Sequence, residues 1–535
     1  MLKSLVLENF KAFGCRTVIP LAPITLIYGQ NSAGKSSILQ ALQLFKQSLD
    51  NRDSQALLLP RSDTGYVDLG SFKELIFDHD LSRALNIRFA FESDSIAVHR
   101  RQRVQPDLVT NNHIEFSFSR NSQTGEIELK HVDLCAKSLH NYIARFAPPA
   151  RRNRSDQRGD ESAWRQRLNS ATAVFTFWGW GDDGRVFWED YFSAMLKNKE
   201  RVFNQLNESL KEIRRESKLV TERQRTQDIS GIKKIIEWVE HGNISELASS
   251  AMQQSMSAEL YLEGFLPKEN DINTKDGYSN FLSPRMIRQR DFYPFLQPGV
   301  ALGDAVINAA NEIQGGLNSL FPLGPFRRPP SRWYVFTGTT PRHVGYQGNL
   351  MPDLLFRKND LMDRTNAWLK RLDLGYQIEV SELGSNASDV FEVRLLDTRR
   401  SRPVRVGLPD VGFGISQILP LVVQSLIASN QIISIEQPEV HIHPKLQADL
   451  GDLFADSIAS QNNQFLIETH SEHLALRILR LVRNGKLRPE DVAILYVQRG
   501  DEGSEVIPIS IDEDGYFIDE FPGGFFPERL DELMG

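Results

Sequence analysis

Residues 29–37, which read GQNSAGKSS, combine two glycines, a lysine and a hydroxyl in the spacing of a phosphate-binding loop. Gly29 and Gly34 permit backbone angles and close approaches that a Cβ atom would obstruct. The backbone amides of such a loop point at phosphate oxygens, while Lys35 adds a full positive charge and Ser36 offers a hydroxyl to Mg²⁺. The spacing therefore predicts that this segment binds ATP or GTP.

Two elements must hold this loop in place. Residues 24–28, ITLIY, are apolar and β-branched, which is typical of a buried strand. After the loop, apolar residues recur at helical spacing through residues 37–49. A strand, a glycine-rich loop and a helix in this order are the context that the phosphate-binding pattern requires.

Two segments in the second half of the chain end an apolar strand in ionisable residues. In residues 432–444, IISIEQPEVHIHP, the strand ends at Glu436, which can hold the water shell of Mg²⁺, and Glu439 adds a carboxylate. In residues 464–474, QFLIETHSEHL, the strand runs to His470. Acids are common at exposed strand ends and a lone histidine is more often structural, so each signal has a structural alternative.

A third segment, residues 408–422, contains a glycine-rich turn that leads into an apolar helix. Gly412 and Gly414 form the turn, and Ser416 is a candidate N-cap. The free amides of such a helix start form a second anion site. An ordinary turn with an ordinary cap is the alternative, and for this segment taken alone it is the preferred interpretation.

Length and composition define the class of protein. The 535 residues leave room for two or three domains, and 41% hydrophobic with 24% charged residues is ordinary for a globular protein. The net charge of −7 gives no sign of a globally basic DNA-binding protein. Cys15 and Cys135 are too few for a disulfide framework or a four-cysteine zinc site, and fit a reducing cytoplasm. Neither a signal peptide nor a membrane span is predicted.

The order of the predicted elements splits the nucleotide-binding fold into two parts. Residues 86–135 alternate as in an antiparallel β-meander, and residues 187–262 are mostly helical in pattern. From residue 404 onward strands and helices alternate again, which favours parallel α/β layers. We therefore predict an α/β P-loop ATPase head with an antiparallel β lobe, split by a mostly helical insertion. The predicted segments are 1–136 (N-terminal part of the head), 137–325 (insertion), 326–500 (C-terminal part of the head) and 501–535 (C-terminal tail).

Taken together and in this order, the motifs resemble the head of ABC-type AAA-family ATPases of the RecF/Rad50/OLD branch. LKSLVLENFKAFG (2–14) resembles the opening strand of that branch, GFGISQ its signature motif, and EQPEVHIHP its Walker B and D-loop region. The similarity covers about residues 1–95 and 330–500 and implies an ATPase with ATP and Mg²⁺ as cofactors. The residues matched are, for Walker A, Gly29, Gln30, Asn31, Ser32, Ala33, Gly34, Lys35, Ser36 and Ser37; for the signature, Gly412, Gly414 and Ser416; for the Walker B acid, Glu436; for the switch histidine, His470; and for the metal, Ser36 and Glu436.

One position departs from the family pattern. Enzymes of this type place a catalytic glutamate directly after the Walker B acid, whereas this chain has Gln437, which is no base. Either Glu439 or Glu436 takes that role, or hydrolysis is slow, since losing a general base typically costs about 10²–10⁴ in rate. With His470 as the γ-phosphate sensor, these two glutamates complete the expected catalytic set.

A narrower resemblance concerns the C-terminal segment 515–533, GYFIDEFPGGFFPERLDEL, together with RRPPSRWY and VGYQGNL. These stretches resemble bacterial AAA-family ATPases that carry a conserved C-terminal domain of unknown function. Some relatives, such as the PtuA ATPases of Septu and certain retron systems, act beside a nuclease in anti-phage defence.

The family resemblance implies a homodimer or higher oligomer, with ATP held between the P-loop of one copy and Ser416 of the other. A nuclease is the expected partner protein, in the cytoplasm and without membrane contact.

Three functions remain open on the sequence alone. The first is an ATP-binding and hydrolysing ATPase whose head dimerisation regulates an effector, a nuclease, in anti-phage defence or DNA metabolism. Arginine clusters at 145–167, 327–332 and 399–405 could contact DNA or RNA phosphates, although solvated loops are the preferred interpretation. The second is an OLD-like nuclease that acts on DNA itself, but too short a stretch follows His470 for that group's nuclease domain. The third is a transport ATPase subunit, against which the large insertion argues.

Overall fold

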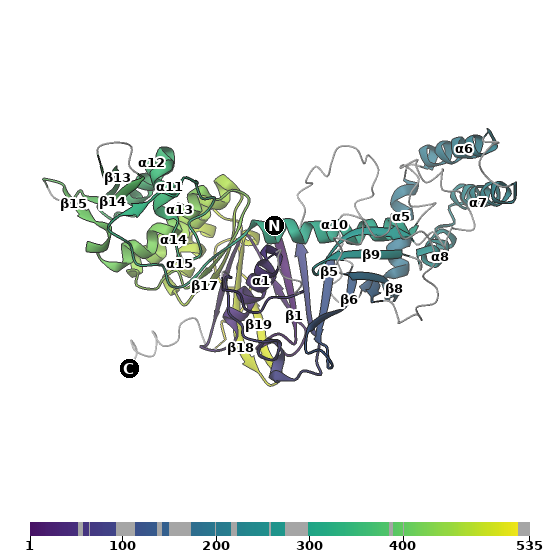
Figure 1. The fold of residues 1–535 in the computed structure, drawn as a ribbon, viewed down its shortest axis with the longest axis horizontal. Coiled ribbons are helices and arrows are strands. Elements are labelled where there is room, and N and C mark those ends of the chain that lie inside the picture. Colours follow the sequence, from purple (N-terminus) through teal and green to yellow (C-terminus); the bar gives the residue numbers. More distant parts are fainter. Residues whose placement is uncertain are drawn as a thin grey trace.

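The computed structural model is elongated, and a central body of sheets carries a helical lobe at each end (Figure 1). One lobe comes from the C-terminal half of the chain and the other from its middle, whereas the central body holds strands from residues 2–29 together with strands from residues 492–509. The structure describes residues 1–51, 57–63, 65–91, 113–135, 142–148, 173–197, 199–215, 222–255, 258–272, 298–384, 389–399 and 401–522.

A six-stranded, mostly parallel sheet joins the two ends of the chain. In sheet order its strands are β11 (Leu320–Leu323), β16 (Ile432–Glu436), β17 (Gln464–Glu468), β3 (Ile24–Gly29), β18 (Val492–Gly500) and β19 (Gly503–Ile509). The central strands are apolar and buried on both faces, as in other parallel sheets that are covered on both sides. The structure thus confirms an α/β head whose sheet is assembled from two separated parts of the chain.

A nine-stranded antiparallel sheet forms the rest of the central body. In sheet order its strands are β10 (Leu266–Ile272), β9 (Ala258–Glu263), β8 (Ala173–Trp180), β7 (Tyr142–Ala147), β6 (Ile127–Cys135), β5 (His113–Arg120), β4 (Leu85–Phe91), β1 (Leu2–Glu8) and β2 (Thr17–Pro20). The predicted meander is present, because β4, β5 and β6 pair in chain order. The sheet continues beyond residue 136 through β7 to β10, so the segment predicted as mostly helical also contributes strands. Helices occupy most of the described residues between β8 and β9, so the helical pattern dominates that part of the sequence.

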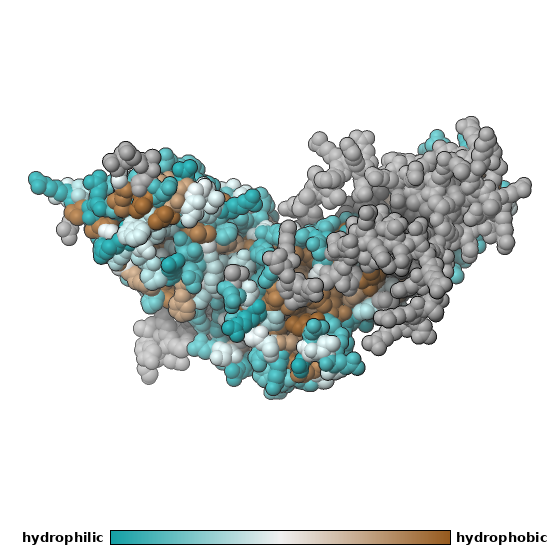
Figure 2. All heavy atoms as spheres, viewed as in Figure 1, coloured by the Kyte–Doolittle hydropathy of each residue, from teal (hydrophilic) through white to brown (hydrophobic). Residues whose placement is uncertain are grey.

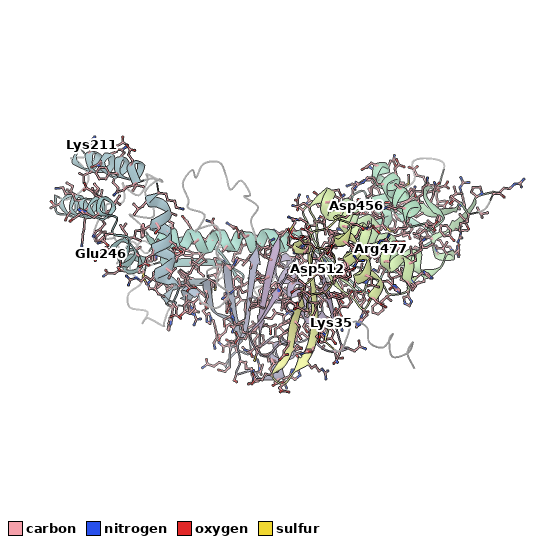
Figure 3. All side chains as sticks on the ribbon, turned by 180° about the vertical axis from the view of Figure 1, so that it is seen from behind. Lys35, Lys211, Glu246, Asp456, Arg477 and Asp512 are labelled. Atoms are coloured by element: carbon pink, nitrogen blue, oxygen red, sulfur yellow. The ribbon has the colours of Figure 1, made fainter. Side chains whose placement is uncertain are left out.

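The middle of the chain adds the helices of one lobe. They are α5 (Gly184–Leu196), α6 (Lys199–Arg215), α7 (Glu222–His241), α8 (Ile244–Gln254) and α10 (Pro298–Ser319). Helix α10 packs on β9, β10, β4 and β5 and then runs directly into β11, so it links the two sheets (Figure 1). Lys211 on α6 and Glu246 on α8 lie at one end of the molecule, whereas Lys35 lies in the central body (Figure 3).

Helix α1 (Lys35–Asp50) fills the space beside both sheets. It contacts β3 and β17 of the parallel sheet and α10 on its other side. Its predicted apolar residues are buried, and the ring of Phe45 packs edge-on against Phe89 and Phe265, each with 5.1 Å between ring centroids. Such aromatic packing anchors the helix and therefore the loop that precedes it.

The C-terminal half builds the second lobe around a small antiparallel sheet. Its elements are β12 (Tyr334–Val335), β13 (Tyr376–Glu382), β14 (Val390–Asp397), β15 (Val404–Gly407), α11 (Met351–Arg357), α12 (Asn359–Arg371), α13 (Phe413–Ile427), α14 (Pro444–Gln461) and α15 (Glu472–Arg483). Short helices elsewhere are α2 (Phe72–Leu75), η1 (Phe77–His79), η6 (Leu408–Asp410) and η7 (Pro489–Asp491). As the alternation predicts, α14 follows β16 and α15 follows β17.

The surface mixes polar and apolar residues on the face drawn in Figure 2, where hydrophobic side chains gather over the nine-stranded sheet. Among the helices in the described ranges, none has both the length and the apolar character needed to cross a bilayer.

Candidate nucleotide-binding site

The P-loop connects β3 to α1 at the carboxyl end of the parallel sheet. Gly29 has φ +142°, and a Cβ there would lie 2.0 Å from the carbonyl oxygen of Val497 on the neighbouring strand β18. Gly34 has φ +97°, and a Cβ there would lie 2.8 Å from the Cβ of Ala12. Both glycines are therefore required by their backbone conformation and by a close neighbour, as well as by the motif.

Lys35 and Ser36 start α1 and face the inside of the loop. The Nζ of Lys35 donates to the carbonyl oxygens of Gly29 and Gln30, at 3.0 and 2.8 Å. The side chain is nearly buried, and burial lowers the pKa of Lys35, against the attraction of Glu468. The Ser36 hydroxyl donates to Oε1 of Glu468 at 2.9 Å.

These residues line a cavity of about 830 Å³. Lys35 and Ser36 lie on one side, and Gln437, Glu468 and His470 reach it from the ends of β16 and β17. Sites for small molecules and cofactors commonly have volumes of about 300–1,000 Å³. The cavity is therefore large enough for a nucleotide, and it combines a cation, a hydroxyl, a carboxylate and an imidazole.

Glu468 is the residue of this site that our sequence reasoning missed. It is the last residue of β17 and only 4% exposed, and its Oε2 has no hydrogen-bond partner among the residues that the structure describes. Burial raises its pKa, and the nearby charge of Glu436 adds to the shift. The available signal was an acid two residues before His470, at the end of an apolar strand that leads toward a helix.

Glu436 ends β16 and lies opposite Glu468 in the sheet register. Its Oε1 accepts a hydrogen bond of 3.1 Å from the buried amide of Gln43 on α1. Burial raises the pKa of Glu436. Among the described residues that line the Lys35 cavity, Glu468 is present and Glu436 is not, and the hydrogen bond of Ser36 goes to Glu468.

Glu439 connects the loop after β16 with the loop after β17. Its Oε2 accepts from the hydroxyl of Thr469 at 2.7 Å, and its Oε1 accepts from the backbone amide of His470 at 2.6 Å. Gln437 supports the same junction, because its backbone amide donates to the Glu468 carbonyl at 2.8 Å. Both oxygens of Glu439 therefore accept hydrogen bonds from the loop that carries His470. Burial raises the pKa of Glu439.

Arg327 is a buried cation behind these acids. It is 4% exposed, and its Nη1 donates to the Pro325 carbonyl, whereas Nε and Nη2 have no partner within the described part of the chain. Burial lowers the pKa of Arg327 to about 10, and the charges of Glu439 and Glu436 oppose this shift. A buried guanidinium with unpartnered donors is costly, so this arginine is a further candidate functional residue.

The predicted signature turn lies outside this cavity, and one prediction about it is wrong. Helix α13 begins at Phe413 with Gly412 as its N-cap, so Ser416 is not the cap but lies within the first turn. The Ser416 hydroxyl donates back to the Phe413 carbonyl at 2.7 Å, and the side chain is mostly buried. Glycine at 412 lets the helix start earlier, and Ser416 then forms the internal bond that is common for helical serines. Gly412 and Phe413 remain exposed, and none of residues 412–416 is among the described residues that line the Lys35 cavity.

The histidines of the HIH stretch and the Asp512 side chain make contacts that stabilise local structure. His443 caps α14 by accepting from the Lys445 amide, and the ring of His441 packs edge-on against Phe413. Asp512 stabilises a turn by accepting from the amide of Tyr516. Within the part of the chain that the structure describes, no group of three or more His, Cys, Asp or Glu side chains is placed to hold a metal.

The arginine clusters are partly neutralised by acids of the same chain. Arg332 makes two hydrogen bonds to Asp410, and Arg399 pairs with Asp397 at 2.7 Å. Arg405 pairs with Glu379 at 2.7 Å. Most of the cluster at 145–167 lies outside the described residues. The paired arginines carry less free charge for phosphate contacts than their number in the sequence indicates.

The C-terminal strands support the P-loop directly. The Ser504 hydroxyl of β19 donates to the Ala33 carbonyl at 2.7 Å, and Arg499 of β18 donates to the Ser32 carbonyl through two nitrogens at 3.3 Å. Because β18 also pairs with β3, the loop is held on one side by residues that follow it by most of the chain length.

Comparisons with known proteins were made by sequence and by structure. Residues 487–535, which include β18 and β19, match a family described as protein of unknown function (DUF3696). No curated protein matches the chain. The Smc head domain from Pyrococcus furiosus, solved with an extended coiled coil and bound to the C-terminal domain of ScpA, is 13% identical, with 100% of this chain and 99% of that chain covered and a TM-score of 0.38. The SMC head domain from Thermotoga maritima is 11% identical, with 95% and 99% covered and a TM-score of 0.35.

The family of this chain is shown by a sequence match. The model of the AAA ATPase domain matches residues 1–274 and 358–475, which together make up more than half of the sequence. These ranges include the P-loop, the signature turn, Glu436, Glu468 and His470. The chain therefore belongs to the AAA ATPase domain family.

Proposed function

We propose that the chain binds and hydrolyses ATP with Mg²⁺, and that bound ATP joins two copies head to tail to regulate a partner effector. The observation that carries this proposal is the cavity of about 830 Å³ in which Lys35 and Ser36 meet Glu468 and His470. This combination supplies a phosphate-binding cation, a metal-binding hydroxyl, a carboxylate, and an imidazole that can respond to the γ-phosphate.

The residues present fit both cofactors. Lys35 now donates to two loop carbonyls, and phosphate oxygens offer stronger, charge-assisted acceptors for the same Nζ. The Ser36 hydroxyl and the Glu468 carboxylate offer oxygen ligands of the hard type that Mg²⁺ prefers, and the Oε2 of Glu468 has no partner among the described residues. In nucleotide sites, phosphate oxygens complete the ligand set. When bound, Mg²⁺ neutralises charge on the phosphates. In the catalytic set, Glu436 and Glu439 stay candidate bases and His470 a γ-phosphate sensor.

A head-to-tail dimer is supported by the position of the signature turn. Gly412 and Phe413 are exposed, and the turn is not among the described residues that line the Lys35 cavity of its own chain. A second copy could therefore present this helix start, with its free amides, to the bound nucleotide. The nuclease partner and the role in anti-phage defence rest on the narrower resemblance of the C-terminal segment, which the match of residues 487–535 supports.

Replacing Lys35 tests nucleotide binding. We expect Lys35→Ala to weaken ATP binding by roughly tenfold to a hundredfold, since hydrogen bonds to charged groups contribute about 1.5–3 kcal/mol. Titration calorimetry with ATP and Mg²⁺ measures the loss. Lys445→Ala is the matched control and leaves affinity unchanged, because it removes an exposed lysine at the start of α14 that pairs with Asp373. Equal ATP affinity in the Lys35 variant and the wild type would refute the proposed site.

A further inference from the structure

The inference rests on the proposed function and names the acidic residue that serves the metal ion. We propose that Glu468, in place of Glu436, supplies the carboxylate on the Mg²⁺ side of the bound nucleotide, together with Ser36. Three independent observations on the structure carry this assignment: a contact, an unpartnered oxygen and the order of the strands.

The first observation is the contact with the P-loop serine. The Ser36 hydroxyl, which offers its oxygen to Mg²⁺ in this motif, donates to Oε1 of Glu468 at 2.9 Å. A carboxylate that accepts from this hydroxyl lies within hydrogen-bond distance of the oxygen that the motif offers to the ion. Glu436 instead accepts from Gln43 on the same helix, two turns further on.

The second observation is the free oxygen of Glu468. Its Oε2 is buried and accepts no hydrogen bond from any described residue, although the side chain lines the cavity. A buried carboxylate oxygen without a partner is costly, so its presence calls for a ligand that the polypeptide itself does not supply. A hard divalent cation satisfies this oxygen directly or through its bound water.

The third observation is the strand order. Strand β17 lies between β16 and β3, so Glu468 is one strand away from the P-loop and Glu436 is two strands away. Parallel strands align their carboxyl ends at one edge of the sheet, where ligands bind in α/β folds. Of these two strand-end acids, Glu468 thus lies on the strand that pairs directly with the P-loop strand.

The surrounding charges favour a divalent cation. Glu436 and Glu439 act on Glu468 with repulsion, and Lys35 acts on it with attraction. Arg327 adds a second positive charge near Glu436 and Glu439. The three acids repel one another, and a divalent cation bound beside Glu468 would relieve this repulsion.

The test compares Glu468→Gln with Glu436→Gln. A fluorescent ATP analogue is titrated into each full-length variant and the wild type, first in EDTA and then at a series of Mg²⁺ concentrations. We expect Glu468→Gln to bind the analogue like the wild type in EDTA, but to need at least about tenfold more Mg²⁺ for the metal-dependent gain in affinity, as is typical when a metal site loses a partner. Glu436→Gln is expected to shift the Mg²⁺ dependence much less. Binding of Mn²⁺, followed by paramagnetic resonance in the presence of the analogue, gives a second readout that does not depend on turnover.

The outcomes separate this inference from the proposed function. A normal Mg²⁺ dependence of Glu468→Gln, or a loss that is equal or larger in Glu436→Gln, overturns the assignment while leaving ATP binding intact. A wild type that binds the analogue neither in EDTA nor with Mg²⁺ overturns the proposed function itself. Glutamine matches glutamate in shape, and Glu468→Asp, which keeps the charge on a shorter side chain, is expected to fall between wild type and Glu468→Gln.

Discussion

Glu436, Glu439 and Glu468 lie at the ends of two neighbouring strands, and burial raises the pKa of each carboxyl group. Their side-chain hydrogen bonds distinguish them. Glu439 accepts from the amide of His470, Glu436 accepts from Gln43 on α1, and Glu468 accepts from Ser36. The nearby Arg327 does not remove the cost of this arrangement, because its own burial outweighs its attraction to the acids. The buried acids and Arg327 thus lower the stability of the fold near the cavity where the chemistry is expected.

At the residue scale we predict that Arg327→Met stabilises the nucleotide-free protein. The folded state lowers the pKa of Arg327, so charged arginine is less favourable there than in the unfolded chain, and methionine avoids that desolvation while filling similar volume. Thermal unfolding is expected to show a higher Tm, together with slower ATP turnover. Arg328→Met, at the exposed neighbouring position, is expected to change neither quantity. A lower Tm for the Arg327 variant would show that its attraction to the two glutamates dominates.

At the scale of elements, α10 is the structural link between the two sheets. It packs on the antiparallel sheet and on α1 and then becomes the edge strand β11. This helix carries Glu312, and burial raises the pKa of that side chain to about 7. Ionisation of Glu312 therefore places a charge in the partly buried surface of α10, the helix that packs against the P-loop helix α1.

The shifted pKa of Glu312 predicts a pH dependence of stability. Between the ordinary glutamate pKa and about 7, the folded state binds more protons than the unfolded state, so the free energy of unfolding falls as the pH rises through this window. Glu312→Gln removes the ionisation and is expected to raise stability over the wild type at pH 8 but not at pH 5. Urea unfolding at both pH values measures the difference. Glu208→Gln, on the exposed side of α6, serves as the control and should show no such pH-dependent gain.

At the scale of the whole molecule, the P-loop and the signature turn belong to different regions of one chain. The P-loop lies in the central body between β3 and α1, whereas α13 lies in the C-terminal lobe (Figure 1). The exposed start of α13 and the absence of its turn from the described lining of the Lys35 cavity favour a site that two copies complete.

We predict that Ser416→Ala separates nucleotide binding from dimerisation. ATP affinity of the single chain is expected to stay unchanged, because Ser416 lies outside the Lys35 cavity. ATP-dependent association is expected to weaken, since the serine hydroxyl must exchange its bond to the Phe413 carbonyl for a phosphate contact in the dimer. Sedimentation velocity with and without ATP measures the association. Unchanged dimerisation of this variant would remove Ser416 from the proposed interface, and a wild type that stays monomeric with ATP would contradict the dimer.

The sequence alone determined the parts of this protein that depend on neighbours along the chain. The strand before residue 29, the spacing of Gly34, Lys35 and Ser36, and the helix that follows are contiguous, so their arrangement follows from local backbone preferences. The alternation after residue 404 predicted the parallel layers in the same way.

The tertiary structure decided which distant residues meet. Strand register places Glu468 beside Ser36, the pairing of β18 with β3 makes Val497 the neighbour that requires Gly29, and the packing of the C-terminal lobe buries Arg327. The early start of α13 likewise turned Ser416 from a cap into an internal helical residue. Hydrogen-bond register and packing join residues that are far apart in the chain, and spacing along a single sequence carries no information about either.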